Sequence, residues 1–125
     1  MKTHITFKLL ILLTSIGLLS GCDKHRAKKL SGTYSCKVAY HYWDMTPSTS
    51  DSTYQEDLEI KQNGKNVIVL GTSIPIDSLW KEKEYYEGNA HNYIEVLFKK
   101  DSIYITRSSG GLGGNASWKY RGSKK

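Results

Sequence analysis

A cysteine and a histidine stand close together in the first strand-like segment of this 125-residue chain, and such a pair could support nucleophilic catalysis. A cysteine nucleophile needs a base within hydrogen-bond distance. Cys36 and His41 are five residues apart in a segment of alternating polarity, so their side chains point to opposite faces. Cys36 also lies between Tyr34 and Val38 on the apolar face. We therefore expect a buried structural thiol and not a nucleophile.

The remaining polar groups do not form a recognisable reactive set. His25, His41 and His91 lack the spacing of metal ligands, and no second cysteine stands near them. The alternating charges of Lys81 to Glu84 are typical of a solvated surface and not of paired catalytic carboxylates. Ser109 to Asn115 is glycine-rich, but it lacks the Gly-Lys-Ser/Thr of a phosphate loop, and a strand follows it. We expect a hairpin connection there, which as a loop is also a candidate lid or partner contact.

These patterns predict a protein that is not an enzyme and that holds no metal and no cofactor.

The second cysteine, Cys22, stands where an apolar run ends. Lys2 and Lys8 lie near the start of the chain, and the apolar run from Leu9 to Leu19 follows them. A short basic region followed by an apolar one is the pattern of a secretory signal. A bilayer span needs about 20 apolar residues, and this run is about half as long. The segment therefore predicts export and not a transmembrane helix.

Residues 19–22 read Leu-Ser-Gly-Cys, which resembles the lipobox of bacterial lipoproteins, Leu-[Ala/Ser]-[Gly/Ala]-Cys, at every position. The resemblance implies that the Cys22 thiol receives a diacylglycerol, that the chain is cut before Cys22, and that the new amine is acylated with a fatty acid such as palmitate. Each buried methylene of an acyl chain adds about 0.8 kcal/mol to membrane binding. Several chains on one residue would hold the protein firmly at a membrane.

Cleavage before Cys22 would leave 104 residues and remove Lys2 and Lys8, so the formal charge would fall from +6 to +4. We expect a signal peptide at 1–21, a lipidated basic tether at 22–31 and one domain at 32–125. The tether either lies against anionic headgroups, where each basic residue gains about 1 kcal/mol, or is simply solvated. An exported, membrane-held domain would rarely meet nucleic acid, so we exclude that class of partner.

The rest of the chain alternates with a period of two and is rich in tyrosine, valine, isoleucine and threonine, as strands are. Asn63-Gly64 predicts a tight hairpin, Pro75 indicates an edge strand, and Ser78 to Glu84 could hold the only helical turn. The expected strands are Thr33 to Trp43, Tyr54 to Lys61, Val67 to Leu70, Ile74 to Ile76, Tyr93 to Lys99, Ser102 to Arg107 and Ala116 to Arg121. A Ser/Thr-rich loop is expected from Thr46 to Thr53. About seven strands joined by short turns predict an all-β fold, a small antiparallel meander barrel or a sandwich.

A family resemblance accompanies this pattern. The chain has a Gly-Thr-Tyr opening at residues 32–34 after the lipobox, a strand meander, a glycine-rich loop and a final Tyr-x-Gly-x-Lys at residues 120–124. It thereby resembles the small lipocalin-like lipoproteins of Bacteroidetes-type bacteria. The resemblance implies a fold and a compartment, but no activity.

Three Asp-Ser sequences suggest covalent modification. Asp51-Ser52-Thr53, Asp77-Ser78-Leu79 and Asp101-Ser102-Ile103 resemble the acceptor motif for O-glycosylation of exported proteins in Bacteroidetes. The alternative is that Asp-Ser serves only as turn chemistry. Ser52, Ser78 and Ser102 are therefore candidate O-glycosylation sites.

Two functions from different classes fit this composition. In the first, His41, Trp43, Trp80 and Trp118 contribute to the mouth of a barrel that binds a small apolar or glycan ligand, because aromatic rings offer large flat contact surfaces. In the second, the loops contact an envelope protein or inhibit it. A barrel of this size is often filled by its own side chains, which would favour the second function.

The location expected for either function is the cell membrane or the outer membrane. Asp23 follows the anchor, which would indicate the inner membrane under enterobacterial sorting rules. No acidic cluster of the kind that directs export to the cell surface follows Cys22. We expect a lipid-anchored domain that faces the periplasm.

Overall fold

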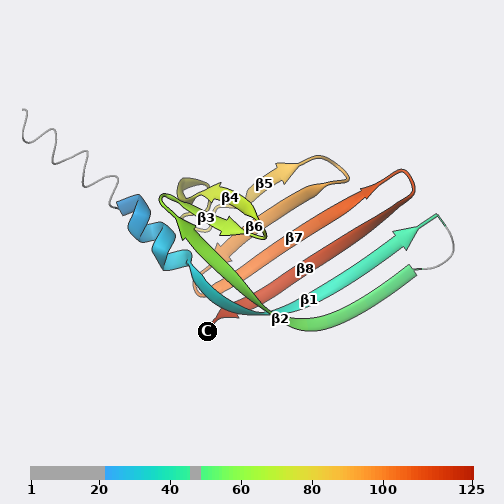
Figure 1. Cartoon of the computed structure of the whole chain (residues 1–125), viewed down its shortest axis with the longest axis horizontal. Helices are drawn as coiled ribbons and strands as arrows, with labels where there is room; N and C mark the ends of the chain where they lie inside the picture. Colours follow the sequence, from blue (N-terminus) through green and yellow to red (C-terminus); the bar gives the residue numbers. More distant parts are fainter. Residues whose placement is uncertain (1–21, 46–48) are drawn as a thin grey trace, which may run out of the picture.

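The computed structural model describes residues 22–45 and 49–125, and Figure 1 shows how its elements are arranged. The expected signal peptide and residues 46–48 of the expected Ser/Thr-rich loop lie outside the described residues. A helix covers residues 22–30, and eight strands form one antiparallel sheet. The strands are β1 (Gly32–Asp44), β2 (Thr49–Asn63), β3 (Asn66–Val69), β4 (Thr72–Pro75), β5 (Tyr85–Gly88), β6 (Tyr93–Lys99), β7 (Ser102–Gly111) and β8 (Gly114–Lys124), with a 3-10 turn η1 (Ile76–Ser78) between β4 and β5.

The sheet is a curled meander with one open seam. The strand order is β4-β3-β2-β1-β8-β7-β6-β5, so every consecutive pair of strands is hydrogen-bonded except β4 and β5, and β8 closes back onto β1. Side chains from both edges nevertheless line one recess, Leu70 and Thr72 near β4 and Glu87 of β5. The predicted all-β, antiparallel, barrel-like fold is confirmed, with eight strands where about seven were expected. Pro75 ends the edge strand β4, as its missing N–H predicts.

The core occupies only the part of the sheet near the helix. On one face of β1, Tyr34, Cys36 and Val38 are buried, whereas Tyr40 is half-buried and Tyr42 is exposed. The four strands β1, β2, β7 and β8 are 10 to 15 residues long and the others four to seven, so the long strands continue past the core, away from the helix (Figure 1). We call this extension, residues 40–44, 49–54, 107–111 and 114–118, the distal sheet.

The segment expected to be a tether is a helix that packs on the sheet. Ala27 and Leu30 are buried on one side of it, three residues apart, as the helical repeat requires. Side chains of the sheet bind its backbone carbonyls: Lys124 Nζ donates to Lys29 O at 2.8 Å and Gln62 Nε2 to Lys24 O at 2.9 Å. Only two residues of the helix, Ala27 and Leu30, are buried, and two apolar positions give a weak helical pattern, which is why the sequence alone suggested a tether.

Several local expectations shift by a few residues. Thr49 to Thr53, expected to be loop, belongs to β2, because β1 offers it a full register of partners from Ala39 to Trp43. The turn predicted at Asn63-Gly64 consists of Gly64 and Lys65, and only Gly64 has positive φ. The glycine-rich stretch reduces to a two-residue turn, Leu112-Gly113, between β7 and β8. The helical turn expected within Ser78 to Glu84 begins two residues earlier, as η1.

A candidate ligand pocket beside the N-terminal helix

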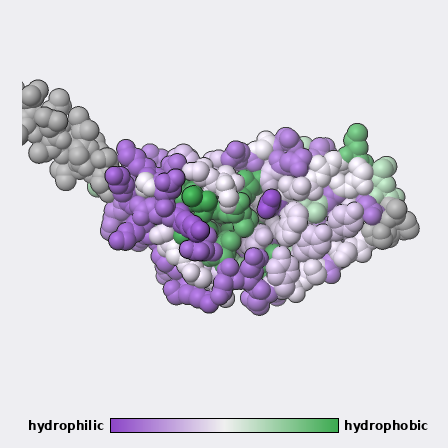
Figure 2. All heavy atoms as spheres, in the orientation of Figure 1, coloured by the Kyte–Doolittle hydropathy of each residue, from purple (hydrophilic) through white to green (hydrophobic). Residues whose placement is uncertain are grey.

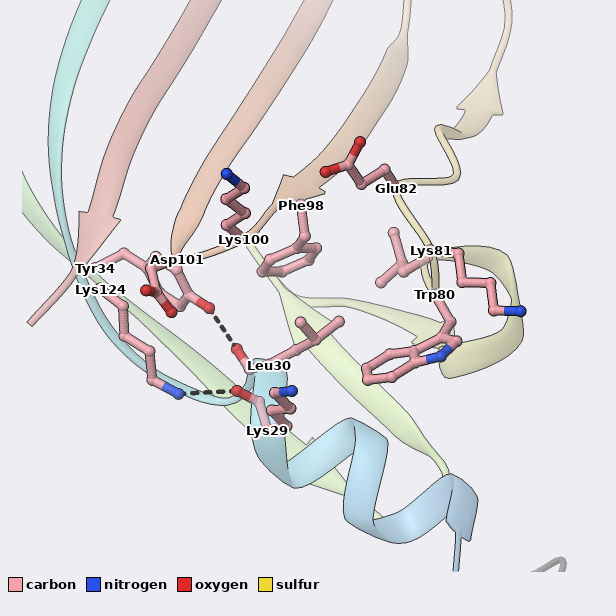
Figure 3. Close-up of a pocket in the computed structure, with 11 residues that line it drawn as sticks. Lys29, Leu30, Tyr34, Trp80, Lys81, Glu82, Phe98, Lys100, Asp101 and Lys124 are labelled. Atoms are coloured by element: carbon pink, nitrogen blue, oxygen red, sulfur yellow. Dashed lines mark hydrogen bonds between the residues drawn. The ribbon is translucent and has the colours of Figure 1, made fainter.

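A cavity of about 250 Å³ opens at the end of the molecule that carries the helix (Figure 3). We call it the basal pocket. The helix, β1, the segment between η1 and β5, β6, the β6–β7 turn and β8 all contribute to it. Its lining residues are Lys29, Leu30, Tyr34, Leu79, Trp80, Lys81, Glu82, Phe98, Lys100, Asp101 and Lys124. In the space-filling view, hydrophobic residues gather next to the helix and are bordered by strongly hydrophilic ones (Figure 2).

The floor of the basal pocket is apolar. Tyr34 and Leu79 are each 1% exposed, Phe98 is 3% exposed, and Leu30 closes the floor from the helix. The rings of Tyr34 and Phe98 meet edge to face with their centroids 5.9 Å apart, a favourable arrangement for aromatic pairs. Burial of these rings gives the cavity a rigid apolar base.

Tyr34 also fastens the helix to the pocket. Its hydroxyl donates a hydrogen bond to the Leu30 carbonyl oxygen at 2.8 Å. Burial, with smaller contributions from Asp101 and Cys36, raises the pKa of Tyr34 to about 12. The phenol therefore stays protonated and remains a donor at neutral pH.

The rim of the pocket carries a surplus of positive charge. Four lysines and two carboxylates line it, so its formal charge is +2. The ion pairs found among the described residues are Arg26–Asp23, His41–Asp51 and Lys125–Asp57, and none of them involves a rim lysine. Lys124 Nζ donates to Lys29 O, but no carboxylate neutralises a rim lysine within this part of the chain, so the rim can attract an anionic group.

The rim also contains strained backbone. Lys81, Glu82 and Lys100 have φ values of 61°, 58° and 53°. A left-handed conformation costs a non-glycine residue about 1–2 kcal/mol. Directly before Lys81, both Leu79 N and Trp80 N donate to Ile76 O, at 3.0 and 2.9 Å. Strain of this kind tends to cluster at ligand sites and is retained where the surrounding structure enforces it.

Trp80 forms the side of the pocket nearest the helix. The Arg26 guanidinium lies 5.2 Å and the Lys29 ammonium 5.8 Å from its ring centroid, within the range of cation–π attraction. Trp80 is the only one of the four predicted contact residues that lines this cavity.

The other three predicted contact residues lie on the distal sheet, and the two faces of the sheet separate them. Trp118 pairs with Tyr40 and shares its face, with ring centroids 5.3 Å apart. His41 and Trp43 occupy the alternate positions of β1 and point to the opposite face, where His41 Nδ1 contacts the Asp51 carboxylate. The single aromatic mouth expected from the sequence is therefore not formed by these residues.

The sequence did not group the residues of the apolar floor, since Leu30 was assigned to the tether, and it did not anticipate the Lys100 and Lys124 rim. Lys100 and Asp101 form the turn between β6 and β7. No local pattern marks these residues as one site, because they come from elements far apart in the chain and meet only when β8 closes onto β1.

The expected burial of Cys36 is confirmed. Its side chain is fully buried, and burial, followed by the carboxylates of Glu56 and Asp57, raises the pKa of the thiol. A raised pKa disfavours the thiolate, which is the nucleophilic form. Cys22, the predicted lipidation site, is exposed at the start of the described part of the helix.

The candidate O-glycosylation sites differ in accessibility. Ser52 is exposed on β2, Ser78 is half-buried in η1, and Ser102 is half-buried at the start of β7. Modification at these positions stays a prediction.

Among the described residues, no three or more histidine, cysteine, aspartate or glutamate side chains come together in a way that could hold a metal ion. Within the same ranges, no helix has the length and apolar character needed to cross a bilayer. Comparisons with protein-family models, with curated proteins and with solved structures find no match to this chain.

Proposed function

We propose that this protein is a lipid-anchored lipoprotein of the bacterial cell envelope that binds a small amphiphile in the basal pocket without catalysing a reaction. The observation that carries the proposal is an apolar cavity of about 250 Å³ whose rim has a formal charge of +2. The apolar floor suits an alkyl chain, and the rim lysines suit a carboxylate or phosphate head. The ligand class is therefore a single-chain anionic amphiphile.

The position of the pocket supports a role at a membrane. The described part of the helix begins at Cys22, the proposed site of acylation, and its nine residues extend about 13 Å at 1.5 Å per residue. Leu30, at its other end, lines the pocket. The pocket would therefore open close to the bilayer surface, and Lys24, Arg26 and Lys28 would add attraction to anionic headgroups.

A binding experiment with chain-matched probes tests this proposal. The mature protein, with Trp80 as the only tryptophan (Trp43→Phe and Trp118→Phe), is placed in nanodiscs of zwitterionic lipid and titrated with dodecanoate, dodecanol and dodecyltrimethylammonium. We expect saturable changes in Trp80 emission, with dodecanoate bound about tenfold more tightly than the cationic probe, a difference of about 1.4 kcal/mol.

Two neighbouring lysines supply the matched variants. Lys100→Glu reverses a charge on the rim and should weaken dodecanoate binding about tenfold while leaving dodecanol unaffected. Lys99→Glu makes the same charge change on a neighbouring lysine that does not line the cavity, and it should leave both affinities within about twofold. Equal effects of the two variants, or equal affinity for dodecanoate and the cationic probe, would refute the proposed ligand class.

A second function, contact with an envelope protein, is favoured by the hairpin tips of the distal sheet. Trp43 is 46% exposed, Met45 76% and Leu112 95%. Asp44 pairs with Gly114, so the two tips lie next to each other and expose apolar side chains together. Crosslinking in the native envelope tests this function: a stoichiometric complex that is lost in Leu112→Asp supports it, and recovery of the uncrosslinked chain alone opposes it.

A further inference from the structure

A second recess lies on the core-side face of the sheet, where the distal sheet begins, and it does not share a lining residue with the basal pocket. Its volume is about 300 Å³, and it spans the open seam between the two edges of the sheet. Thr72 borders it from β4, Glu87 from β5, and Arg107 and Ser109 from β7. We call it the polar recess.

An aromatic surface continues from this recess across the distal sheet. The register places Ser52, Tyr40, Trp118 and Arg107 in one row across β2, β1, β8 and β7. The Arg107 guanidinium lies 5.6 Å from the Trp118 ring centroid, and that ring lies 5.3 Å from the Tyr40 ring. Arg107 thus belongs to both the aromatic surface and the polar recess.

These rings are not buried by a core. Tyr42 and Tyr54 share the face of Tyr40 and are 36% and 40% exposed. Tyr40 and Trp118 are half-buried. The strand pattern that buries Tyr34, Cys36 and Val38 therefore continues onto an uncovered surface, where the next two residues of this face, Tyr40 and Tyr42, are both aromatic. Aromatic rings on an open surface offer flat faces for stacking.

The polar groups of the recess retain unused hydrogen-bonding capacity. No ion pair or hydrogen bond engages the Arg107 guanidinium within the described ranges, although it has five N–H donors. Glu87 Oε2 accepts a hydrogen bond from the Tyr85 hydroxyl at 2.6 Å, which leaves its other carboxylate oxygen free of that bond. One guanidinium and one carboxylate give the recess no net charge, so its charge balance suits an uncharged ligand that both donates and accepts.

We propose that the polar recess and the adjoining rings form a binding site for an uncharged saccharide, with a pyranose ring stacked on Trp118 and Tyr40 and its hydroxyls bound by Arg107 and Glu87. An alkyl chain would leave the guanidinium and the carboxylate without partners, which costs free energy for buried polar groups. A polyanion would be attracted by only one arginine and repelled by the carboxylate of Glu87 in the same recess. A sugar satisfies both groups because each hydroxyl is a donor and an acceptor.

The test uses Trp118 as the reporter. The mature protein with Trp43→Phe and Trp80→Phe is titrated with cellotetraose, maltotetraose, mannotetraose and chitotetraose to about 10 mM, about ten times the Kd of a millimolar site. We expect saturable fluorescence changes with at least one of these saccharides and none with tetragalacturonate, which is anionic. Failure of all four to saturate the signal overturns the proposal.

Variants on the two faces of the sheet place the site. Arg107→Gln should weaken the affinity at least tenfold, and Arg107→Lys should restore part of it, as loss of a charge-assisted hydrogen bond predicts. Lys119→Gln, next to Trp118 but on the opposite face, should change the affinity less than about twofold. Equal losses in Arg107→Gln and Lys119→Gln would contradict the assignment.

This inference does not depend on the amphiphile proposal, and the two can be separated. Saccharide affinity should be unchanged when the basal pocket is saturated with dodecanoate. Competition between the two probes would mean that they share one cavity and would overturn the assignment of a separate site. Loss of dodecanoate binding with retained saccharide binding would refute the first proposal alone.

Discussion

Tyr34 connects the core, the basal pocket and the helix. Its ring packs against Phe98, and its hydroxyl donates a hydrogen bond to the Leu30 carbonyl oxygen at 2.8 Å. The side chain is 1% exposed, and its pKa is raised to about 12 mainly by burial. A single residue thus couples the ionisation of a phenol to the attachment of the helix.

Tyr34→Phe should lower the free energy of unfolding by about 1–3 kcal/mol at pH 7, because it leaves the Leu30 carbonyl without its donor. Urea denaturation measures this loss. Tyr104→Phe, at an exposed tyrosine that is 40% accessible, is the control and should cost less than about 0.5 kcal/mol. A smaller loss in Tyr34→Phe than in the control would contradict the role assigned to the hydroxyl.

Tyr34 also predicts a dependence of stability on alkaline pH. The folded-state pKa, about 12, is higher than the ordinary value of 10.0, so the unfolded chain loses this proton first. The stabilisation is therefore complete below pH 10 and is lost as the pH rises towards 12. Tyr34→Phe should show a shallower loss of stability across this window, and an unchanged slope would refute the assignment.

At the scale of the elements, the hydrogen-bonded β1–β8 seam, which is distinct from the open seam between β4 and β5, joins two four-stranded meanders. β1 to β4 and β5 to β8 are each sequential, and the register from Tyr34↔Lys124 to Asp44↔Gly114 connects them. Gly122 allows close approach at this seam: a Cβ there would stand 2.4 Å from Cys36 Sγ and 2.7 Å from Ser35 O. The seam therefore depends on the absence of a side chain at one position.

Gly122→Ala should destabilise the fold by about 1–3 kcal/mol, the usual cost of overpacking a core. Thermal or urea unfolding measures the effect. Gly113→Ala, in the β7–β8 turn, is the matched control, because nothing lies within 4 Å of a Cβ at that position. Equal stabilities of the two variants would contradict the close contact between β1 and β8.

The sequence predicted those elements in which hydrophobic alternation decides the structure. Tyr93 to Lys99 is β6 with the expected bounds, and its alternating apolar residues Ile94, Val96 and Phe98 are buried. β5 was missed because none of its four residues is fully buried, so pairing with β6 defines it and alternation does not. The helix was missed because its packing depends mainly on contacts with distant residues such as Lys124.

The candidate sites were harder to predict than the strands. The sequence grouped Trp80 and Trp118 as candidate contact residues in one mouth, whereas they line or adjoin different cavities. Strand alternation determines which face a residue occupies, but it does not show where the core ends along a long strand. The lengths of β1, β2, β7 and β8 relative to their neighbours determine that boundary.

At the scale of the whole molecule, the two proposed sites lie at different places along the sheet. The basal pocket adjoins the helix that carries Cys22, and the aromatic surface lies on strands that continue away from that helix (Figure 1). With Cys22 acylated, the first site would face the bilayer and the second would project from it. This arrangement would allow one small domain to hold an amphiphile at the membrane and a saccharide beyond it.

Native and denaturing mass spectrometry of the protein purified from its own host tests the central proposal most directly. The account predicts a mass excess in the native spectrum that matches a single-chain anionic amphiphile, that disappears on denaturation, and that is much reduced in Lys100→Glu but not in Lys99→Glu. A native mass equal to that of the covalently modified chain alone, with no ligand released on denaturation, would contradict the proposed binding function.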